Sequence, residues 1–322
     1  AYTTIDDPSA HFQTDIYTGN GSSQSLTFDG NSDMQPDWLW TKCRSDNFDP
    51  IMRDTSRGIA NRLLVHATDA EGGATGTTSM DSDGFSIDST ATVNSNSETF
   101  VAWGWKGNGG TTSSDSNGDQ TSTVQVNTTA GFSIATFAAS SSAGQTVGHG
   151  LGAAPEFYIW KSRARDDNWY IYHKAAGKGG YLRLNTTDSF TSNTNLWSNT
   201  DPSSTVIYYG GNSLTNNNED HILYSFKSIQ GYSKFGNYVG NGSSEGTYVY
   251  TGFRPAWIMI KRTDSSTNGN WFIIDDKRST GNVRLGHLRA NQTNEENTST
   301  NQSIDFLANG FKLRDSNTSL NS

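Results

Sequence analysis

One short apolar pattern, opened by proline and ended six residues later by lysine, occurs three times in the sequence. The copies read PDWLWTK at residues 36–42, PEFYIWK at residues 155–161 and PAWIMIK at residues 255–261. Aromatic and β-branched residues after a proline are typical of a β-strand. Because the runs are apolar at successive positions, each copy of this marker pattern predicts a strand in the middle of a sheet that is covered on both faces.

Other segments recur in the same order around the marker pattern. An aromatic run precedes each copy, at residues 12–17, 132–137 and 232–238, and the string GNGSS follows the first and third of these runs at residues 19–23 and 240–244. Asn-Gly favours a hairpin turn, because both central residues of a type I′ turn need a positive φ. Strands ending in lysine come later, FVAWGWK at residues 100–106 and HILYSFK at residues 221–227. The distance from marker lysine to closing lysine is 64 residues in the first copy and 66 in the second, which indicates a true internal repeat.

The repeat predicts an all-β chain of three tandem β-sandwich domains, of the jelly-roll or lectin-like kind, with about 100 residues each. We expect domains at residues 9–110, 121–228 and 229–322, preceded by an N-terminal arm at residues 1–8. Residues 111–120 are rich in Gly, Ser and Thr, which predicts a linker. No segment has a sustained period of 3.6, so little helix is expected. Equal spacing places Trp38, Phe157 and Trp257 at equivalent core positions.

Composition limits the classes of function. Hydrophobic residues make up only 32% of the chain, but 9 Trp, 13 Tyr and 15 Phe favour small domains with aromatic cores over a disordered chain. The net charge of −9 and the lack of a basic stripe argue against a nucleic-acid partner. We expect no membrane insertion, because no apolar run approaches about 18 residues, and no signal peptide is recognisable. Cys43 is the single cysteine, so an intrachain disulfide is impossible.

Several long stretches carry a family resemblance: AYTTIDDPSAHFQT at residues 1–14, VNTTAGFSIATF at 126–137, GHGLGAAPEFYIWK at 148–161, GYSKFGNYVGNGSSEG at 231–246 and TGFRPAWIMIKR at 251–262. With these stretches the chain resembles an uncharacterised repeat family of virion proteins of tailed bacteriophages, often described as tail fibres and frequent in marine and cyanobacterial phages. The resemblance implies a structural protein, made in the host cytoplasm and assembled into the virion with other virion proteins. It also implies a homo-oligomer, with a trimer favoured, and possible contact with a host-surface glycan.

Two other functions remain open, a carbohydrate-binding lectin-like array and a head-surface decoration protein. A polysaccharide-cleaving enzyme would need two carboxylates about 5–10 Å apart in a cleft, which a sequence cannot place. The sequence contains no nucleophile elbow, no P-loop and no dinucleotide-binding fingerprint. We therefore predict a protein that is not an enzyme and has no cofactor.

Three local features are candidate sites. Trp197 lies in a Ser/Asn/Thr-rich stretch and is a candidate for stacking on a sugar, although a buried ring under a long loop is the alternative. Asp115, Asn117 and Asp119 alternate around a glycine as in calcium loops, but the distant glutamate of an EF-hand is missing, and the same residues are common in linkers. Cys43 is either a reactive thiol or a packed core residue.

Spacing also predicts ion pairs across a hairpin. Lys42 lies 12 residues before Asp54, and Lys261 lies 14 before Asp275, so we expect each pair to meet at the sandwich rim.

The third repeat should lack its closing strand. Transferring the spacings of the first repeat places that strand near position 326 and its lysine near 325, beyond residue 322. Truncation of a longer chain is the favoured explanation, and donation of a strand by a neighbouring subunit, from its N-terminal arm at residues 1–8, is the alternative.

Overall fold

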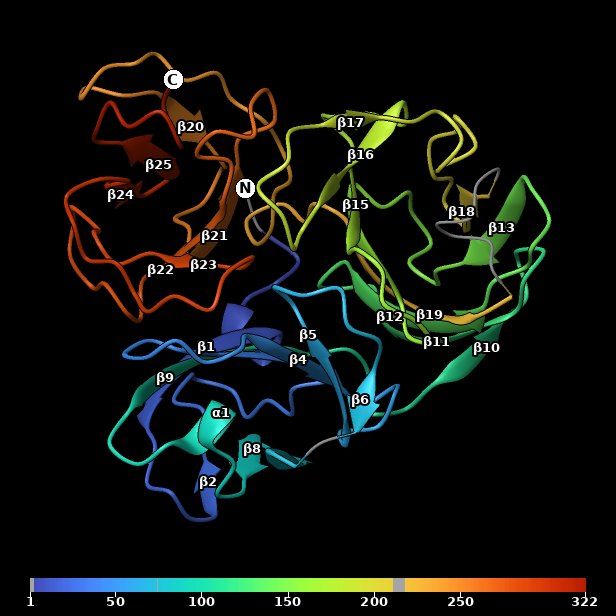
Figure 1. Cartoon of the computed structure of the whole chain (residues 1–322), viewed down its shortest axis with the longest axis horizontal. Helices are drawn as coiled ribbons and strands as arrows, with labels where there is room; N and C mark the ends of the chain where they lie inside the picture. The colour runs from blue at the N-terminus through green and yellow to red at the C-terminus, as the bar shows by residue number, and fades with distance from the viewer. Residues whose placement is uncertain (1–2, 74, 211–217) are drawn as a thin grey trace.

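The computed structural model describes residues 3–73, 75–210 and 218–322, and it confirms the all-β prediction. Antiparallel sheets form most of the ordered elements, and the helical segments are a 3-10 turn, η1 (Pro8–Ala10), and the four-residue helix α1 (Ala91–Asn94). We call residues 9–110 unit 1, residues 111–228 unit 2 and residues 229–322 unit 3. In Figure 1 the three units surround a common centre, with unit 1 below, unit 2 to the right and unit 3 at the upper left.

Unit 1 consists of two sheets packed face to face. Its inner sheet has the order β1-β9-β3-β4-β5-β6, formed by β1 (Phe12–Thr18), β3 (Trp38–Cys43), β4 (Ile51–Asp54), β5 (Asn61–Leu64), β6 (Gly72–Gly73) and β9 (Thr99–Trp105). Its outer sheet has the order β2-β8-β7, formed by β2 (Gln24–Leu26), β7 (Thr77–Asp81) and β8 (Gly84–Ile87).

Unit 2 has the same plan with a wider inner sheet, in the order β10-β11-β12-β19-β14-β15-β16-β17. The strands are β10 (Ser113–Asp115), β11 (Ser122–Asn127), β12 (Phe132–Ala138), β14 (Phe157–Ser162), β15 (Tyr170–His173), β16 (Gly180–Arg183), β17 (Thr191–Ser192) and β19 (Asp220–Phe226). A two-stranded outer sheet pairs β13 (Gln145–Gly148) with β18 (Val206–Tyr209). Part of the segment expected as a linker is therefore the edge strand β10, which pairs with β11.

Unit 3 is the smallest. Its inner sheet has the order β21-β22-β23 and its outer sheet the order β20-β25-β24. The strands are β20 (Tyr248–Tyr250), β21 (Trp257–Lys261), β22 (Trp271–Asp275), β23 (Leu288–Arg289), β24 (Ile304–Leu307) and β25 (Gly310–Leu313).

The closing strand occupies the same place in units 1 and 2. In unit 1, β9 pairs with both β1 and β3, and Trp105 lies opposite Trp38. In unit 2, β19 pairs with both β12 and β14, and Phe226 lies opposite Phe157. The repeat seen in the sequence is thus a repeat of strand pairing.

A shared asparagine contact extends this correspondence to unit 3. The Asn94 amide donates to two backbone carbonyls, those of Ser22 and Asp88, each at 2.6 Å. The Asn321 amide donates to the carbonyls of Ser243 and Asp315 at 2.7 and 2.8 Å. Unit 3 therefore follows the plan of unit 1 from its GNGSS turn to residue 321.

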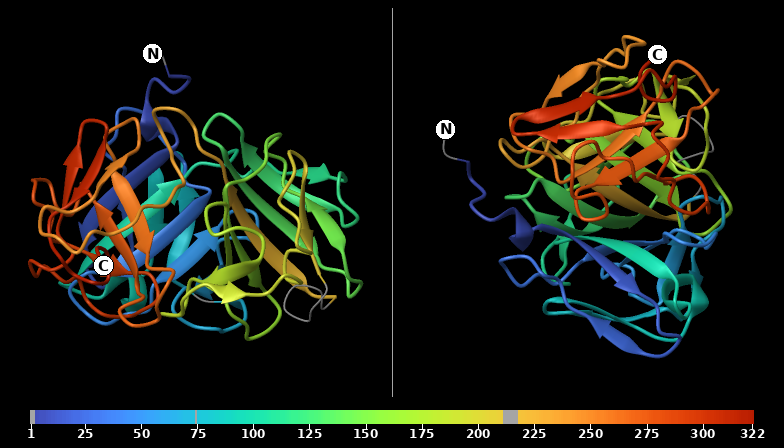
Figure 2. Two further views of the ribbon diagram at one scale, coloured as in Figure 1. Left: turned by 90° about the horizontal axis from the view of Figure 1, so that it is seen from above. Right: turned by 90° about the vertical axis from the view of Figure 1, so that its left-hand side faces the viewer.

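One hydrophobic cluster, which we call the central core, connects all three units. The inner sheet of each unit contributes to it, and Trp38 and Phe157 are buried members while Trp257 is partly buried against it. The two further views in Figure 2 show the three units lying next to one another. The marker strands are apolar on both faces because one face covers the central core and the other covers the outer sheet of the same unit.

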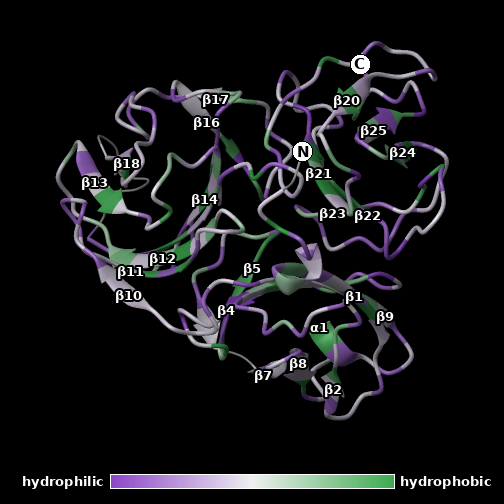
Figure 3. Cartoon of the chain, turned by 180° about the vertical axis from the view of Figure 1, so that it is seen from behind, coloured by the Kyte–Doolittle hydropathy of each residue, from purple (hydrophilic) through white to green (hydrophobic). Residues whose placement is uncertain are grey.

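Each unit also has its own cluster between its inner and outer sheets. Phe85 and Phe100 belong to this cluster in unit 1, Trp160 and Tyr209 in unit 2, and Phe306 in unit 3. Figure 3 shows hydrophobic colour on many of the strands and hydrophilic colour along many of the connecting loops. Each unit thus contains a pair of packed sheets, and the inner faces of the units form a single core.

A buried histidine in unit 2 makes stability depend on pH. The Trp160 indole N–H donates to Nδ1 of His221 at 2.9 Å, and burial lowers the pKa of His221 from 6.5 to about 3. Because the unfolded chain takes up this proton near pH 6.5 and the folded chain does not, His221 stabilises the fold fully above pH 6.5. This contribution is lost as the pH falls from 6.5 towards 3, by about 1.4 kcal/mol per pH unit.

We expect His221→Asn, which keeps an acceptor but does not titrate, to lower the slope of unfolding free energy against pH by about one proton between pH 4.5 and 6. Urea unfolding at several pH values measures this slope. An unchanged slope in the variant would show that His221 is protonated in the folded protein.

Candidate functional site

The lysine that ends each marker pattern lies in a seam between two units. Each ammonium group donates to a backbone carbonyl of a neighbouring unit: Lys42 to Gln292 at 2.7 Å, Lys161 to Thr68 at 2.9 Å and Lys261 to Thr187 at 2.9 Å. Burial lowers the pKa of Lys42 to about 7 and those of Lys161 and Lys261 to about 8. The contacts run in one cyclic direction, from unit 1 to unit 3, from unit 3 to unit 2 and from unit 2 to unit 1.

These contacts correct the predicted Lys–Asp pairs. Asp54 lies opposite Trp38 in the sheet, and Asp275 lies opposite Trp257, so each aspartate is four positions from its expected lysine partner. A spacing of 12 or 14 residues does not fix where a hairpin turns, and the observed register pairs each aspartate with the tryptophan at the start of its marker strand.

A buried ion network joins units 1 and 2. Asp54 and Arg57 form a fully buried pair at 2.6 Å, and Arg57 also contacts Glu71 at 2.7 Å. Glu71 continues the network to Arg163 of unit 2 at 2.8 Å. The Tyr224 hydroxyl, also from unit 2, donates to Asp54 at 2.6 Å. Every charge in the network has a partner, as buried charges require.

A second network of the same design joins units 3 and 1. Asp275 and Arg278 pair at 2.6 Å, and Glu296 contacts both Arg278 at 2.6 Å and Arg44 of unit 1 at 2.7 Å. The Trp103 indole N–H donates to Asp275 at 3.0 Å, in the role that Tyr224 has in the first network. The sequence signal for both networks is an Asp-x-x-Arg motif that begins at the last residue of the strand, and the spacing from lysine alone did not reveal it.

The seam between units 2 and 3 has different residues at these positions. His173 lies opposite Phe157 as Asp54 lies opposite Trp38. The Phe190 amide donates to the Thr263 carbonyl at 2.8 Å, matching the backbone bonds from Glu71 to Arg163 and from Glu296 to Arg44. This third seam is therefore less charged than the other two.

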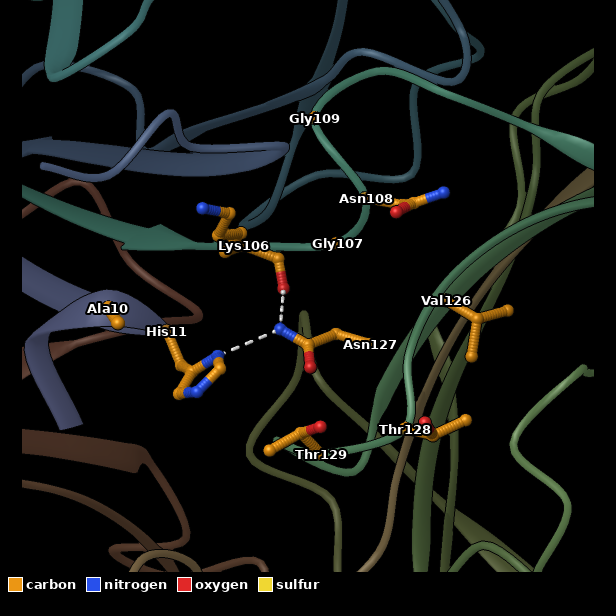
Figure 4. Close-up of a pocket in the computed structure, with 10 residues that line it drawn as sticks. All are labelled: Ala10, His11, Lys106, Gly107, Asn108, Gly109, Val126, Asn127, Thr128 and Thr129. Carbon is orange, nitrogen blue, oxygen red and sulfur yellow. Dashed lines mark hydrogen bonds between the residues drawn. The ribbon is translucent and has the colours of Figure 1, made fainter. Parts of the chain in front are cut away.

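A pocket of about 460 Å³ lies between units 1 and 2 (Figure 4). His11 from unit 1 and Asn127 from unit 2 point toward each other across it, with 3.0 Å between the His11 Nδ1 and the Asn127 Nδ2. The same Asn127 amide donates to the Lys106 carbonyl at 3.1 Å. His11 and Asn127 are thus engaged in joining the two units.

A second pocket of about 440 Å³ lies between residues 228–235 and residues 250–252. Glu156, Lys234, Phe235 and Tyr250 are among its lining residues. The Lys234 ammonium lies 5.8 Å from the centre of the Tyr250 ring, and Tyr250 is 60% exposed. This pocket opens next to the segment that leads into β21.

Trp197 is fully buried, which corrects the proposal that it stacks on a sugar. It packs in the cluster between the unit 2 sheets with Tyr158 and Trp160, and its indole N–H donates to the Gly180 carbonyl at 2.9 Å. A polar sequence context could not reveal this, because the surrounding loop covers the ring.

The candidate calcium residues have separate roles. Asp115 accepts hydrogen bonds from the Asn117 backbone and amide at 2.9 and 2.7 Å, whereas Asp119 accepts from Thr146 at 3.0 and 2.7 Å. Within the described ranges no group of three or more His, Cys, Asp or Glu side chains is placed to hold a metal ion. Cys43 is buried in the unit 1 cluster with its thiol 3.4 Å from the Thr99 carbonyl, and burial raises its pKa.

Among the helices of residues 3–73, 75–210 and 218–322, none has the length and apolar character needed to cross a membrane. Comparison with curated proteins gave no match, and comparison with solved structures gave none either. A family model described as "Domain of unknown function (DUF7483)" matches residues 7–322, across all three units. The chain therefore belongs to the DUF7483 family.

Proposed function

We propose that the protein is a structural component of a bacteriophage particle, a tail fibre or a related appendage. The observation that carries this proposal is that the buried charged groups of the repeat bind other parts of the same chain. The marker lysines and both Asp–Arg–Glu networks contact protein groups across the seams, and so they stabilise the assembly of units.

Three units that share one core and are joined by buried ion networks form a rigid scaffold. Such a scaffold suits a virion protein that must keep its shape when force acts on it. The phage-like stretches of the sequence supply the second support, since they extend over all three units. Loops at the rim of such a scaffold are where contact with a host surface would be made.

Labelling of intact particles tests the proposal. Particles of the phage that encodes the chain would be purified, analysed by mass spectrometry and labelled with gold-conjugated antibodies against the protein. We expect the protein among the virion components and the label on tail appendages. Label on the capsid surface would instead support a decoration protein, and absence from the particles would refute both structural roles.

Carbohydrate binding is a second candidate, favoured by two exposed tyrosines. Tyr248 and Tyr250 are two residues apart on β20, so they share one face of that strand, and their exposed fractions are 43% and 60%. Exposed rings on one face of a strand form a surface on which sugar rings can stack.

If β20 binds glycans, Tyr250→Ala should weaken binding at least about tenfold, as expected for a loss of about 1.4 kcal/mol. A glycan array followed by titration of the best ligand measures this effect. Trp197→Phe is the matched control, because that buried ring should leave affinity unchanged. Equal affinity in wild type and Tyr250→Ala, or no glycan bound at all, would exclude this site.

A further inference from the structure

Asn-Gly pairs are positions where a protein chain can modify itself. The chain contains six of them, at residues 20–21, 108–109, 117–118, 241–242, 268–269 and 309–310. In such a pair the backbone nitrogen of the glycine can attack the side-chain carbonyl carbon of the asparagine, because glycine has no side chain to hinder the approach and lets the backbone turn freely. A glycine N–H that is held in a hydrogen bond must first give up that bond. The folded structure therefore decides which pair can react.

One of the six glycine amides is free to attack. Four others donate hydrogen bonds within the protein at 2.8–3.2 Å: Gly21, Gly109, Gly242 and Gly269. Gly310 lies in β25, which pairs with β20 on one side and with β24 on the other. The Gly118 amide makes no hydrogen bond to any residue that the structure describes, and the preceding Asn117 is exposed. Asn117 is thus the asparagine whose attacking nitrogen is unrestrained.

The side chain of Asn117 holds a buried carboxylate. Asn117 lies in the loop between β10 and β11, and its backbone N–H and side-chain amide donate to one oxygen of Asp115 at 2.9 and 2.7 Å. Within the described ranges these are the hydrogen bonds that the Asp115 carboxylate accepts. Asp115 is 7% exposed and is the last residue of β10. The end of this strand therefore depends on the amide of Asn117.

We propose that Asn117 is a site of spontaneous deamidation, and that its conversion to an acid loosens the edge strand β10. The Gly118 nitrogen forms a bond to Cγ of Asn117 and closes a five-membered succinimide ring, while the side-chain nitrogen leaves as ammonia with the proton of the Gly118 amide. Water then opens the ring at either carbonyl and leaves aspartate or isoaspartate at position 117. Water is the sole co-reactant, and the inference does not depend on the proposed function.

Loss of the amide removes a donor and adds a charge. The Asp115 carboxylate would lose its bond from the Asn117 side chain and would face a second negative charge beside it, which is unfavourable for a buried carboxylate. β10 is the end strand of its sheet and pairs with β11 through three residue pairs. A strand with so few partners should detach first when its last residue is destabilised.

Peptide mapping by mass spectrometry tests the reaction. The 322-residue chain would be incubated in mildly alkaline buffer, folded or unfolded in urea, and the amide-to-acid conversion would be followed with time. Asn20 is the internal control, because it is also exposed but its Gly21 amide donates to the Asn94 carbonyl at 3.0 Å. In the folded protein Asn117 should react at least about fivefold faster than Asn20, because the Gly21 amide must first break its hydrogen bond.

Unfolding should remove this difference, since urea frees both amides, and the two rates should then be similar. Equal rates in the folded protein, or faster conversion at Asn20, would refute Asn117 as the preferred site. A difference that persists unchanged in urea would show that local sequence rather than the fold selects the site, and would refute the structural argument.

Asn117→Asp tests the consequence, because it places the product in the folded chain. Hydrogen exchange at residues 113–115 should become at least about fivefold faster than in the wild type, as expected when one hydrogen bond is lost. Asn20→Asp, which adds the same charge at another exposed turn, should leave exchange at residues 113–115 unchanged. Unchanged exchange in Asn117→Asp, or equal acceleration in both variants, would refute the loosening of β10.

Discussion

Replacing Arg57 with methionine is expected to lower the free energy of unfolding by about 3–5 kcal/mol. Arg57 is fully buried and contacts both Asp54 at 2.6 Å and Glu71 at 2.7 Å. Its loss would leave the Asp54 carboxylate without its cation in a site that excludes water, and an unpaired buried charge is far more costly than an absent pair. Arg278→Met should have an effect of the same size, because its network repeats the design.

Urea unfolding of the two variants measures these losses. Lys174→Met is the control, because the Lys174 side chain is 68% exposed and its pair with Glu156 lies at the surface. We expect a change within about 0.5 kcal/mol for this control. A loss of less than about 1 kcal/mol in both arginine variants would contradict the assignment of the networks to the seams.

The third seam provides a stricter version of this experiment. Its residues could be transferred to the first seam by four substitutions, Asp54→His, Arg57→Ala, Glu71→Phe and Arg163→Thr. Because replacing a whole buried network by packed residues can be neutral while breaking it is not, the fourfold variant should be more stable than Arg57→Met alone.

Trp38→Ala is expected to lower the free energy of unfolding by about 3–5 kcal/mol. The Trp38 ring is 2% exposed and stacks on Tyr224 of unit 2 at a centroid distance of 4.7 Å, so its loss leaves a cavity where two units meet. Trp257→Ala, at the equivalent position of unit 3, should cost less than half as much, because that ring is only partly buried and β21 pairs with β22 alone among the described strands.

Trp38 and Trp257 are the same residue type at the same position of the repeat. Comparing their alanine variants therefore isolates the effect of the different burial of the two rings. Chemical unfolding gives both values under identical conditions. Equal losses would contradict the partial burial of Trp257, and a loss at Trp38 below about 1.5 kcal/mol would mean that the central core does not connect units 1 and 2 as described.

The sequence predicted the strands well because the same apolar pattern recurs in each unit, so that each copy supports the strand assigned to the others. The marker pattern forms a strand in all three units, and FVAWGW and HILYSF lie in the closing strands, each followed directly by its lysine. Apolar residues at successive positions correctly indicated strands covered on both faces. They could not indicate what covers the inner face, since another sheet of the same domain and a neighbouring unit demand the same side chains.

The polar contacts were harder to predict, because they depend on which units meet. Lys42 and Gln292 are 250 residues apart in the chain, and no local spacing connects them. For Trp197 the difficulty is local. Ser, Asn and Thr around a tryptophan are equally consistent with an exposed ring and with a ring buried beneath its own loop, and the ring is buried.

Differential scanning calorimetry of the whole chain is the most direct test of the central claim, that the three repeats share one core and fold together. We predict a single transition whose calorimetric and van't Hoff enthalpies agree, with a total near 60 °C of about 0.7 kcal/mol per residue. Three separable transitions, or a calorimetric enthalpy about three times the van't Hoff value, would show that the units unfold independently and would contradict the shared core.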